Sequence, residues 1–312
     1  MKNILITGIN GFVGSSLAQM ELNKGNNVIG IVRDINKKTQ KDILNKCSII
    51  NGDIIDAELV DRVVSDYEID LIYHIAAMAI VKIAKNNPIG CYKNNIMGTI
   101  NILDAVRKIN PKIKVIVASS DKAYGVHDTL PYTEDMKLQP EDPYSTSKAC
   151  ADLIAQSYQK TYGIDINVIR CANIYGARDM NLSRLIPNTI IQILNGNKPK
   201  IYSGVIGFKR EFIFIDDVCD AYSLLSEKGV SGEIYNIGDN EFYTVGSTID
   251  TISTIMNYSG GNEVIEKDFL EIPFQYMSAD KLKGLGWTKK YTFKQGLDKT
   301  IKWYKEYLDN NI

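Results

Sequence analysis

Short apolar runs alternate along the first half of the chain with longer segments in which apolar residues recur at helical spacing. The runs predict strands at 4–7, 28–32, 48–50, 71–75, 114–118 and 166–170, and the longer segments predict helices at 11–23, 56–67, 88–108 and 143–162. The strand runs are apolar throughout rather than at alternate positions. This pattern is typical of a parallel sheet that helices cover on both faces.

The rhythm loosens after about residue 172. Short helices near 182–194 and 244–256 are expected to mix with short strands at 200–202 and 212–215, with Gly, Asn and Pro between them. The expected fold is therefore α/β, a doubly wound parallel sheet (Rossmann) with a smaller mixed α/β C-terminal substrate lobe. We expect one domain at 1–172, to which 210–240 returns, and a smaller lobe at 173–312.

Composition and charge exclude several classes of protein. The 312 residues include 36 basic and 37 acidic side chains, a net charge of −1, so there is no electrostatic reason to expect nucleic acid or a membrane as partner. Five widely spaced cysteines without a C-x-x-C pair, and two histidines, argue against a metal site or a disulfide framework. No apolar stretch approaches the roughly 20 residues of a membrane helix. The N-terminus reaches a glycine loop before any signal-peptide core, so a cytoplasmic protein is expected.

The first strand leads into I-T-G-I-N-G-F-V-G, with Gly8, Gly11 and Gly14 between strand and helix. This G-x-x-G-x-x-G spacing is a variant of the dinucleotide fingerprint, in which glycines allow a tight turn and close approach of a pyrophosphate to the helix N-terminus. Phe12 and Val13 open that helix and are expected beside the cofactor. The alternative is a structural turn that binds no nucleotide.

The ends of the second and third strands indicate which cofactor is used. Val32 stands where an acid for the ribose of NAD is usual, and Arg33 and Asp34 follow. An arginine there pairs with a 2′-phosphate, so NADP is expected, tightly bound and recycled. In the alternative, Asp34 binds the ribose of NAD and Arg33 is a solvated surface residue. Asp53, followed by Ile54, is placed to reach the adenine or simply to make a turn.

A polar group, Ser119 to Lys122, follows directly on the apolar run at 114–118, and Y-S-T-S-K follows at 144–148. Tyr144 and Lys148 are four residues apart and so share one helix face. A tyrosine has a free pKa of about 10, and a neighbouring ammonium favours its phenolate. This pair is a candidate base for oxidising a hydroxyl group.

Together these motifs resemble the extended short-chain dehydrogenase/reductase family, in particular its nucleotide-sugar epimerases and dehydratases. The resemblance covers nearly the whole chain and is carried by T-G-I-N-G-F-V-G at 7–14, H-I-A-A at 74–77, N-I-M-G-T at 95–99, S-S-D-K-A-Y-G at 119–125, P-Y-S-T-S-K at 143–148, R-C-A-N-I-Y-G at 170–176 and R-E-F-I-F-I-D-D-V at 210–218. The missing acid at position 32 departs from the family pattern for NAD.

The resemblance implies a role for individual residues. Tyr144 would be the base for sugar-hydroxyl oxidation, Ser120 would bind the same hydroxyl, and Lys148 would hold the nicotinamide ribose. Further expected cofactor contacts are Ala76, Ala77 and Asn95, the last lying behind the active site, and expected substrate contacts are Asn173, Arg210 and Leu185 of S-R-L-I-P. Lys82 is expected to face the sugar, or else to be a solvated lysine. By analogy, a homodimer is expected to form a four-helix bundle from the helices at 88–109 and 143–162.

Asp121 and Lys122 are expected to choose the reaction. A 4,6-dehydratase must deprotonate C5 and protonate the leaving hydroxyl on C6, whereas a 4-epimerase only returns the hydride to C4. The family's dehydratases carry Asp-Glu or Asp-Lys here, so Asp121 is the candidate acid at C6 and Lys122 the candidate base at C5. An NDP-hexose 4,6-dehydratase is therefore expected. The alternatives are a structural Asp-Lys ion pair in an NDP-sugar 4-epimerase, or a non-catalytic nucleotide-sensing protein.

Overall fold

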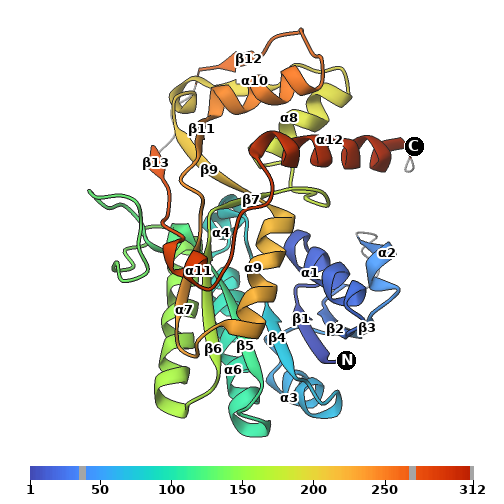
Figure 1. Cartoon of the computed structure of the whole chain (residues 1–312), viewed down its shortest axis with the longest axis vertical. Helices are drawn as coiled ribbons and strands as arrows, with labels where there is room; N and C mark the ends of the chain where they lie inside the picture. Colours follow the sequence, from blue (N-terminus) through green and yellow to red (C-terminus); the bar gives the residue numbers. More distant parts are fainter. Residues whose placement is uncertain (35–39, 267–271, 310–312) are drawn as a thin grey trace.

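The computed structural model describes residues 1–34, 40–266 and 272–309 (Figure 1). Within them, a parallel sheet has the strand order β10-β6-β5-β4-β1-β2-β3. The strands are β1 (Asn3–Thr7), β2 (Asn27–Val32), β3 (Ser48–Asn51), β4 (Leu71–His74), β5 (Lys114–Ser120), β6 (Ile166–Cys171) and β10 (Ile234–Ile237). The order reverses between β1 and β4, which is where open α/β sheets bind their ligands.

Helices cover both faces of this sheet, which confirms the expected fold class. One face carries α1 (Phe12–Asn23) and α9 (Ile215–Lys228), and the other carries α3 (Ala57–Asp66), α6 (Gly98–Ile109) and α7 (Pro143–Tyr162). Shorter helices are α2 (Lys41–Leu44), α4 (Val81–Asn86) and α5 (Pro88–Tyr92). Central-strand residues such as Leu5, Ile72 and Val115 are fully buried, as the uniform apolar runs require.

The helix predicted at 88–108 differs from the expectation in its middle. Residues Lys93–Met97 form a π-helical turn between α5 and α6. The spacing of apolar residues in the sequence is compatible both with a continuous α-helix and with a helix that contains one π-turn, because a single π-turn adds only one residue. Such turns often occur at functional sites. Here the turn carries Asn94 and Asn95, both buried.

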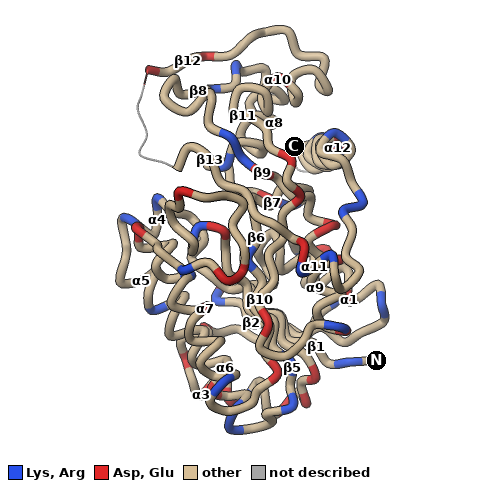
Figure 2. Tube along the Cα trace, turned by 60° about the vertical axis from the view of Figure 1, so that its left-hand side comes forward, with Lys and Arg blue, Asp and Glu red and all other residues tan. Residues whose placement is uncertain are grey.

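The rest of the chain forms a smaller lobe beyond the carboxyl ends of the large sheet's strands (Figures 1 and 2). Its main sheet joins β7 (Asn173–Tyr175), β9 (Lys209–Phe214), β11 (Phe242–Thr244) and β13 (Phe274–Gln275), and β8 (Lys200–Tyr202) pairs with β12 (Glu263–Ile265). Its helices are α8 (Leu185–Leu194), α10 (Val245–Ile255) and α12 (Phe293–Asp309), whereas α11 (Asp280–Gly284) packs against β10 of the large sheet. One apolar core runs from β1 and α9 into this lobe, so the two parts share packing.

Two boundaries differ from the sequence expectations in this region. The helix expected from 182 begins at Leu185, because the Asn181 side chain holds Ser183 in a turn before it. The strand expected at 212–215 is β9, which ends at Phe214 so that Ile215 opens α9. Within 210–240, β9 belongs to the smaller sheet, whereas β10 joins the large one.

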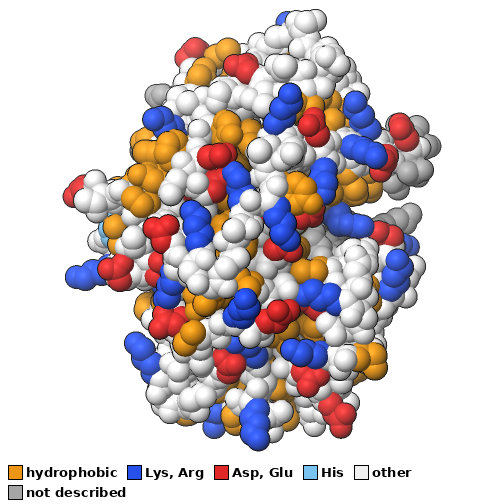
Figure 3. Space-filling model, in the orientation of Figure 1, with side chains coloured by type: hydrophobic (Ala, Val, Ile, Leu, Met, Phe, Trp, Pro, Cys, Tyr) orange, Lys and Arg blue, Asp and Glu red, His pale blue; other side chains and the backbone are white. Residues whose placement is uncertain are grey.

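The surface carries charges of both signs in close mixture. On the face seen in Figure 3, lysines and arginines alternate with aspartates and glutamates without a large area of one sign. This agrees with the near-zero net charge. In the described part of the chain, no helix combines the length and apolar character that crossing a membrane requires.

Candidate active site

The glycine loop has a shape that only glycine permits at two points. Gly8 has φ +72°, and a Cβ there would lie 2.9 Å from the Ala76 backbone. A Cβ on Gly14 would lie 2.2 Å from the carbonyl oxygen of Gly8, so helix α1 packs against the loop itself. The Gly11 N–H closes the turn onto the Gly8 oxygen at 2.9 Å. All three glycines therefore shape a tight strand-to-helix connection.

The start of α1 is suited to an anion. The helix begins at Phe12 after Gly11, and within the described chain no side chain caps it and no acid lies in its first turn. Its N–H groups therefore keep their capacity to donate, and the helix dipole adds partial positive charge. Further along the same sheet edge, the buried Ser119 Oγ has no hydrogen-bond partner among the described residues. A dinucleotide with its pyrophosphate at α1 fits these features.

The region expected to bind the adenosine ribose, at the ends of β2 and β3, contains an ion pair that was not predicted from the sequence. Arg33 and Asp53, which were considered separately, approach to 3.8 Å, with 63% of the arginine and 29% of the aspartate side chain exposed. Asp53 also accepts the Ile55 N–H at 3.2 Å. Ile54 is buried under α6, where Asn101 binds its carbonyl oxygen at 2.9 Å. Both Arg33 and Asp53 thus lie at the end of β2 and β3, where the adenosine would be held.

A buried histidine helps to fix the segment that follows β4, which contains Ile75 and Ala76. The Oγ1 of Thr7 accepts the N–H groups of Ile75 and Ala76 at 3.1 Å and bonds His74 Nδ1 at 2.9 Å. Burial and the charge of Lys148 lower the pKa of His74 to about 3, so the ring is neutral. The Thr99 hydroxyl donates its hydrogen to the backbone carbonyl oxygen of Asn95. In the contact with His74, Thr99 Oγ1 is therefore the acceptor, and His74 Nε2–H donates to it.

Asn95 ties this loop to helix α7. Its Oδ1 accepts the Met78 N–H at 2.7 Å, and its Nδ2 donates to Ser147 Oγ at 2.8 Å. The oxygen and the nitrogen of the side-chain amide are thus both hydrogen-bonded to protein groups, and Asn95 is 2% exposed. The residue predicted behind the active site holds the segment of Ala76 and Ala77 in place.

Helix α7 presents Tyr144 and Lys148 on the face toward β5. Asp142 caps the helix by accepting the Tyr144 N–H at 2.9 Å, Pro143 opens it, and Gly163 ends it with φ +68°. The Lys148 ammonium donates to the carbonyl oxygen of Ala118, one residue before Ser119. The tyrosine and lysine of the predicted pair therefore meet the end of β5, where S-S-D-K begins.

The electrostatics of this pair follow from burial. Burial raises the pKa of Tyr144 to about 12, and the hydrogen bond with Ser120 and the positive charge of Arg184 act in the opposite direction. Burial also lowers the pKa of Lys148 to about 8. Tyr144 therefore keeps its proton at neutral pH until further positive charge arrives, and Lys148 changes charge close to physiological pH.

Asp121 and Lys122 enter the site from a short 3-10 turn, Asp121–Ala123, at the end of β5. The Asp121 carboxylate is 5% exposed and accepts from Ser120 Oγ at 2.9 Å. The Lys122 ammonium donates to Gln275 Oε1 at 2.6 Å. Although adjacent and both within the described residues, the two form no ion pair with each other, contrary to the structural alternative. Acid and amine are held apart by different partners.

The predicted substrate residues lie on the lobe above this site, with one exception. Asn173 on β7 donates to the Glu211 carbonyl oxygen at 3.1 Å, and Arg210 on β9 is 8% exposed and donates to the Ile272 oxygen at 2.9 Å. Leu185 is the first residue of α8. Lys82 is exposed on α4, a helix that packs against α7.

Sequence reasoning missed Gln275, Tyr132 and Arg184 as neighbours of the site. Gln275 lies 153 positions after Lys122, on a strand of two residues, so no periodic pattern marks it. Tyr132 and Arg184 lie in connections, and Arg184 was noted only as part of S-R-L-I-P. Packing between the two lobes, which sequence patterns do not report, brings all three to the site.

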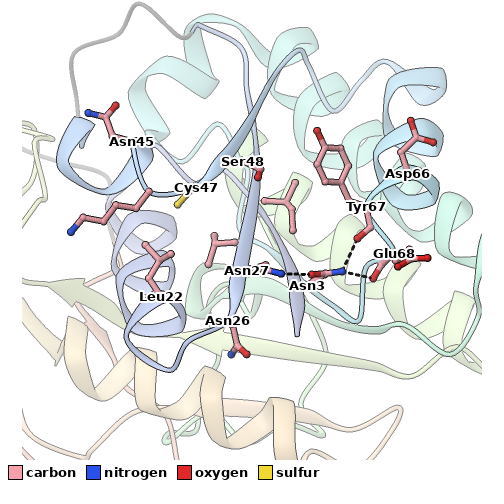
Figure 4. Close-up of a pocket in the computed structure, with 13 residues that line it drawn as sticks. Asn3, Leu22, Asn26, Asn27, Asn45, Cys47, Ser48, Asp66, Tyr67 and Glu68 are labelled. Atoms are coloured by element: carbon pink, nitrogen blue, oxygen red, sulfur yellow. Dashed lines mark hydrogen bonds between the residues drawn. The ribbon is translucent and has the colours of Figure 1, made fainter. Parts of the chain in front are cut away.

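A hollow of about 710 Å³ lies at the opposite end of the large sheet from the candidate site, where β1, β2 and β3 begin (Figure 4). Asn3 crosses it and donates to the carbonyl oxygens of Tyr67 and Glu68 at 3.0 and 3.3 Å. None of the predicted site residues lines it. Among the described residues, no group of three or more His, Cys, Asp or Glu side chains could hold a metal ion.

Comparison with known proteins gives the family. The family model described as GDP-mannose 4,6 dehydratase matches residues 5–300. The chain belongs to this dehydratase family. The match confirms the resemblance to nucleotide-sugar epimerases and dehydratases.

Both reaction types occur among similar members of the dehydratase family and its structural neighbours. A dTDP-glucose 4,6-dehydratase of Bacillus anthracis, solved with NAD, is 31% identical, with TM-score 0.88 over 99% of this chain and 98% of that one. A UDP-glucose 4-epimerase of Thermotoga maritima, solved with UDP-glucose, is 26% identical, with TM-score 0.91 over 98% and 99%.

A trifunctional UDP-glucose 4,6-dehydratase, 3,5-epimerase and reductase of Arabidopsis thaliana is 30% identical over 98% of this chain. The chain spans about half the length of that relative, 47%. The likeness is therefore to one part of a longer protein.

Proposed function

We propose that the protein is an NDP-hexose 4,6-dehydratase. The observation that carries the proposal is that Asp121 and Lys122 reach the site of Tyr144 without neutralising each other, since Ser120 holds the acid and Gln275 the amine. A second acid/base pair facing the hexose is what water elimination needs beyond C4 oxidation. An epimerase has no use for it.

Tyr144, Ser120 and Lys148 perform the oxidation at C4. Ser120 and Tyr144 bind the C4 hydroxyl, and Tyr144 takes its proton. Because burial raises the pKa of Tyr144 to about 12, this transfer needs the positive charge of Lys148 and of the cofactor nearby. When bound, the nicotinamide supplies the hydride acceptor for C4 and the hydride donor for C6. Lys148 holds the nicotinamide ribose.

Asp121 and Lys122 perform the elimination. The C4 ketone makes the C5 hydrogen acidic, and Lys122 in its neutral form removes it as a proton. Asp121, protonated, gives its proton to the C6 oxygen as the C6–O bond breaks, so the hydroxyl leaves as water. Lys122 returns to its neutral form when C5 is protonated and C6 receives the hydride, and the proton that Tyr144 took from the C4 hydroxyl replaces the one that Asp121 gave to the leaving water. The product is a 4-keto-6-deoxy sugar nucleotide.

Arg210 and Asn173 serve the diphosphate, and Leu185 packs against the nucleotide. Arg210 and Asn173 sit on adjacent strands of the smaller sheet, so one rigid element carries both. Lys82, exposed on α4, contributes a sugar contact. The cofactor contacts come from the glycine loop, with Phe12 and Val13, and from Ile54, Ala76 and Ala77.

NADP is the proposed cofactor, with NAD as the alternative. The exposed Arg33 guanidinium, held by Asp53 at 3.8 Å, supports pairing with a 2′-phosphate. The Bacillus anthracis dehydratase, solved with NAD, favours the alternative. Binding titrations with both nucleotides decide between them.

A homodimer is proposed through α5, α6 and α7. Ile89, Tyr92 and Leu153 lie on these helices and Met97 on the π-helical turn between α5 and α6, with 69%, 36%, 55% and 46% of their surface exposed, a high proportion for large apolar side chains. The two helical segments pack side by side, as half of a four-helix bundle requires.

The test of the function is a panel of nucleotide sugars with each common base. The expected product has lost one water and carries a C4 ketone and a C6 methyl group. The 4-epimerase alternative, which the Thermotoga maritima neighbour favours, predicts consumption of substrate with unchanged mass. Turnover that disappears in Tyr144→Phe eliminates the non-catalytic alternative.

A further inference from the structure

The amine proposed as base is held by a residue from the other lobe. Lys122 belongs to a turn of three residues after β5, and its Nζ donates to Oε1 of Gln275 at 2.6 Å. Gln275 lies on β13 and is 2% exposed. A side chain that is so completely buried has few accessible rotamers. The hydrogen bond to Gln275 therefore fixes the position of the Lys122 ammonium group.

The direction of each hydrogen bond in this contact follows from chemistry. An ammonium only donates, so the amide oxygen of Gln275 must face Lys122 and its NH₂ must face away. The NH₂ lies 3.5 Å from the Tyr132 hydroxyl oxygen, and that hydroxyl donates to the Gly125 carbonyl oxygen at 2.6 Å. The amide cannot turn over without losing its bond to the ammonium.

Backbone contacts hold both ends of this chain of hydrogen bonds. The Tyr132 N–H donates to the Tyr276 oxygen and the Ser278 N–H donates to the Tyr132 oxygen, each at 2.9 Å, one and three residues after Gln275. In the smaller sheet, Gln275 pairs in register with Arg210. Lys122 is thus attached to β13, which pairs with β9, the strand that carries the proposed diphosphate arginine.

A neutral acceptor suits a base better than the alternatives. Among the described residues, charged or titratable groups beside this contact include Asp121 on the same turn, Tyr132, whose hydroxyl lies 3.5 Å from the Gln275 amide, and Arg210, which pairs with Gln275 from β9. A carboxylate at 275 would keep the proton on Lys122. An apolar side chain would release the ammonium to pair with Asp121, which would disable both the acid and the base.

We propose that Gln275 is a positioning residue that holds the amine of Lys122 for removal of the sugar C5 proton. The inference rests on the proposed dehydratase function. In the step that it serves, the C5–H bond breaks and its proton goes to Nζ of neutral Lys122. The electron pair of that bond forms the C5–C6 double bond as the C6–O bond breaks, and the hydroxyl leaves as water with the proton of Asp121.

The test compares Gln275→Met and Gln275→Glu with the wild-type protein and with Gln192→Met on α8 as control. Two steps are measured separately. A rapid quench with borodeuteride traps any 4-ketone that keeps its C6 hydroxyl, and solvent deuterium at C5 with release of water reports elimination.

In Gln275→Met, elimination should slow by about 10²-fold, the cost of a catalytic group misplaced by an ångström, while C4 oxidation keeps its rate. The trapped ketone should therefore accumulate. In Gln275→Glu, the acidic limb of the kcat profile should move up by about one to three pH units, because the carboxylate holds the proton on the amine. Gln192→Met should match the wild type.

Two results overturn the inference in distinguishable ways. If the wild-type protein loses water but Gln275→Met slows oxidation as much as elimination, or slows neither, Gln275 does not position the base and the dehydratase function stands. If the wild-type protein converts sugar nucleotides without ever losing water, the proposed function fails and the role of Gln275 fails with it.

Discussion

The buried pair of Asp152 and Arg170 gives the sharpest prediction for stability. Asp152 on α7 and Arg170 on β6 have side chains 0% and 2% exposed, and Nε and Nη2 of the arginine donate to the two carboxylate oxygens at 2.8 and 3.1 Å. The guanidinium also donates to the Tyr124 hydroxyl at 2.8 Å and lies 4.7 Å from the centre of that ring. Tyr124 follows the Asp121–Ala123 turn, so the pair supports the catalytic segment.

Asp152→Asn keeps the shape and removes the charge. Removing one partner of a buried pair leaves the other charge without compensation, which costs about 3–5 kcal/mol. The lower part of that range applies here, because Arg170 keeps its bonds to Tyr124 and to the Glu134 oxygen. A loss of about 3 kcal/mol lowers the folding equilibrium constant by about two orders of magnitude.

The assay is urea unfolding followed by far-ultraviolet circular dichroism, with Asp104→Asn as matched control. Asp104 also bonds two cations, Arg107 at 2.7 Å and Lys108 at 2.8 Å, but its side chain is 24% exposed. Because solvent screens them, such exposed pairs contribute far less to stability than the buried pair. If Asp152→Asn loses no more free energy of unfolding than Asp104→Asn, the reasoning from burial is refuted. The double variant Asp152→Leu with Arg170→Met should be more stable than Asp152→Asn.

Four further predictions concern the site and the assembly. Tyr144→Phe should lower kcat by about 10²–10⁴-fold, measured by product formation, whereas Tyr158→Phe on the same helix should not. The pKa of Lys148 is about 8, so its positive charge, and with it kcat, should fall as pH rises through that value; a Lys148→Arg variant that keeps the alkaline limb would contradict this. Arg33→Ser should weaken NADP binding in calorimetry more than NAD binding, and equal effects would remove Arg33 from cofactor selection. Leu153→Glu should convert a dimer to a monomer in sedimentation, and unchanged sedimentation would exclude this face.

Local patterns were enough to predict much of the fold. Uniform apolar runs identified the strands of the parallel sheet except β10, and the spacing of Tyr144 and Lys148 placed both on one helix face, because these features depend on residues close in sequence. The glycine spacing worked for the same reason, since Gly8 and Gly14 meet across one turn. Features that depend on residues close in sequence can therefore be predicted from the sequence.

Contacts between distant segments were out of reach. The π-helical turn at Lys93–Met97 leaves the apolar stripe nearly unchanged, so it gives no signal. Arg33 and Asp53 meet only because β2 and β3 are neighbours in the sheet. Gln275 reaches Lys122 through the packing of the two lobes. These arrangements depend on how distant segments pack in the folded protein. The residue types involved also occur at ordinary surface and core positions, so they do not reveal the contacts.

The most direct measurement of the central claim follows the hydrogen atom of C4. An NDP-hexose carrying deuterium at C4 should give a 4-keto-6-deoxy product with that deuterium on C6 and a solvent hydrogen at C5. This outcome requires oxidation by Tyr144, deprotonation by Lys122 and loss of water assisted by Asp121 in a single site. Return of the deuterium to C4, in a product of unchanged mass and inverted configuration, would contradict the dehydratase and identify a 4-epimerase.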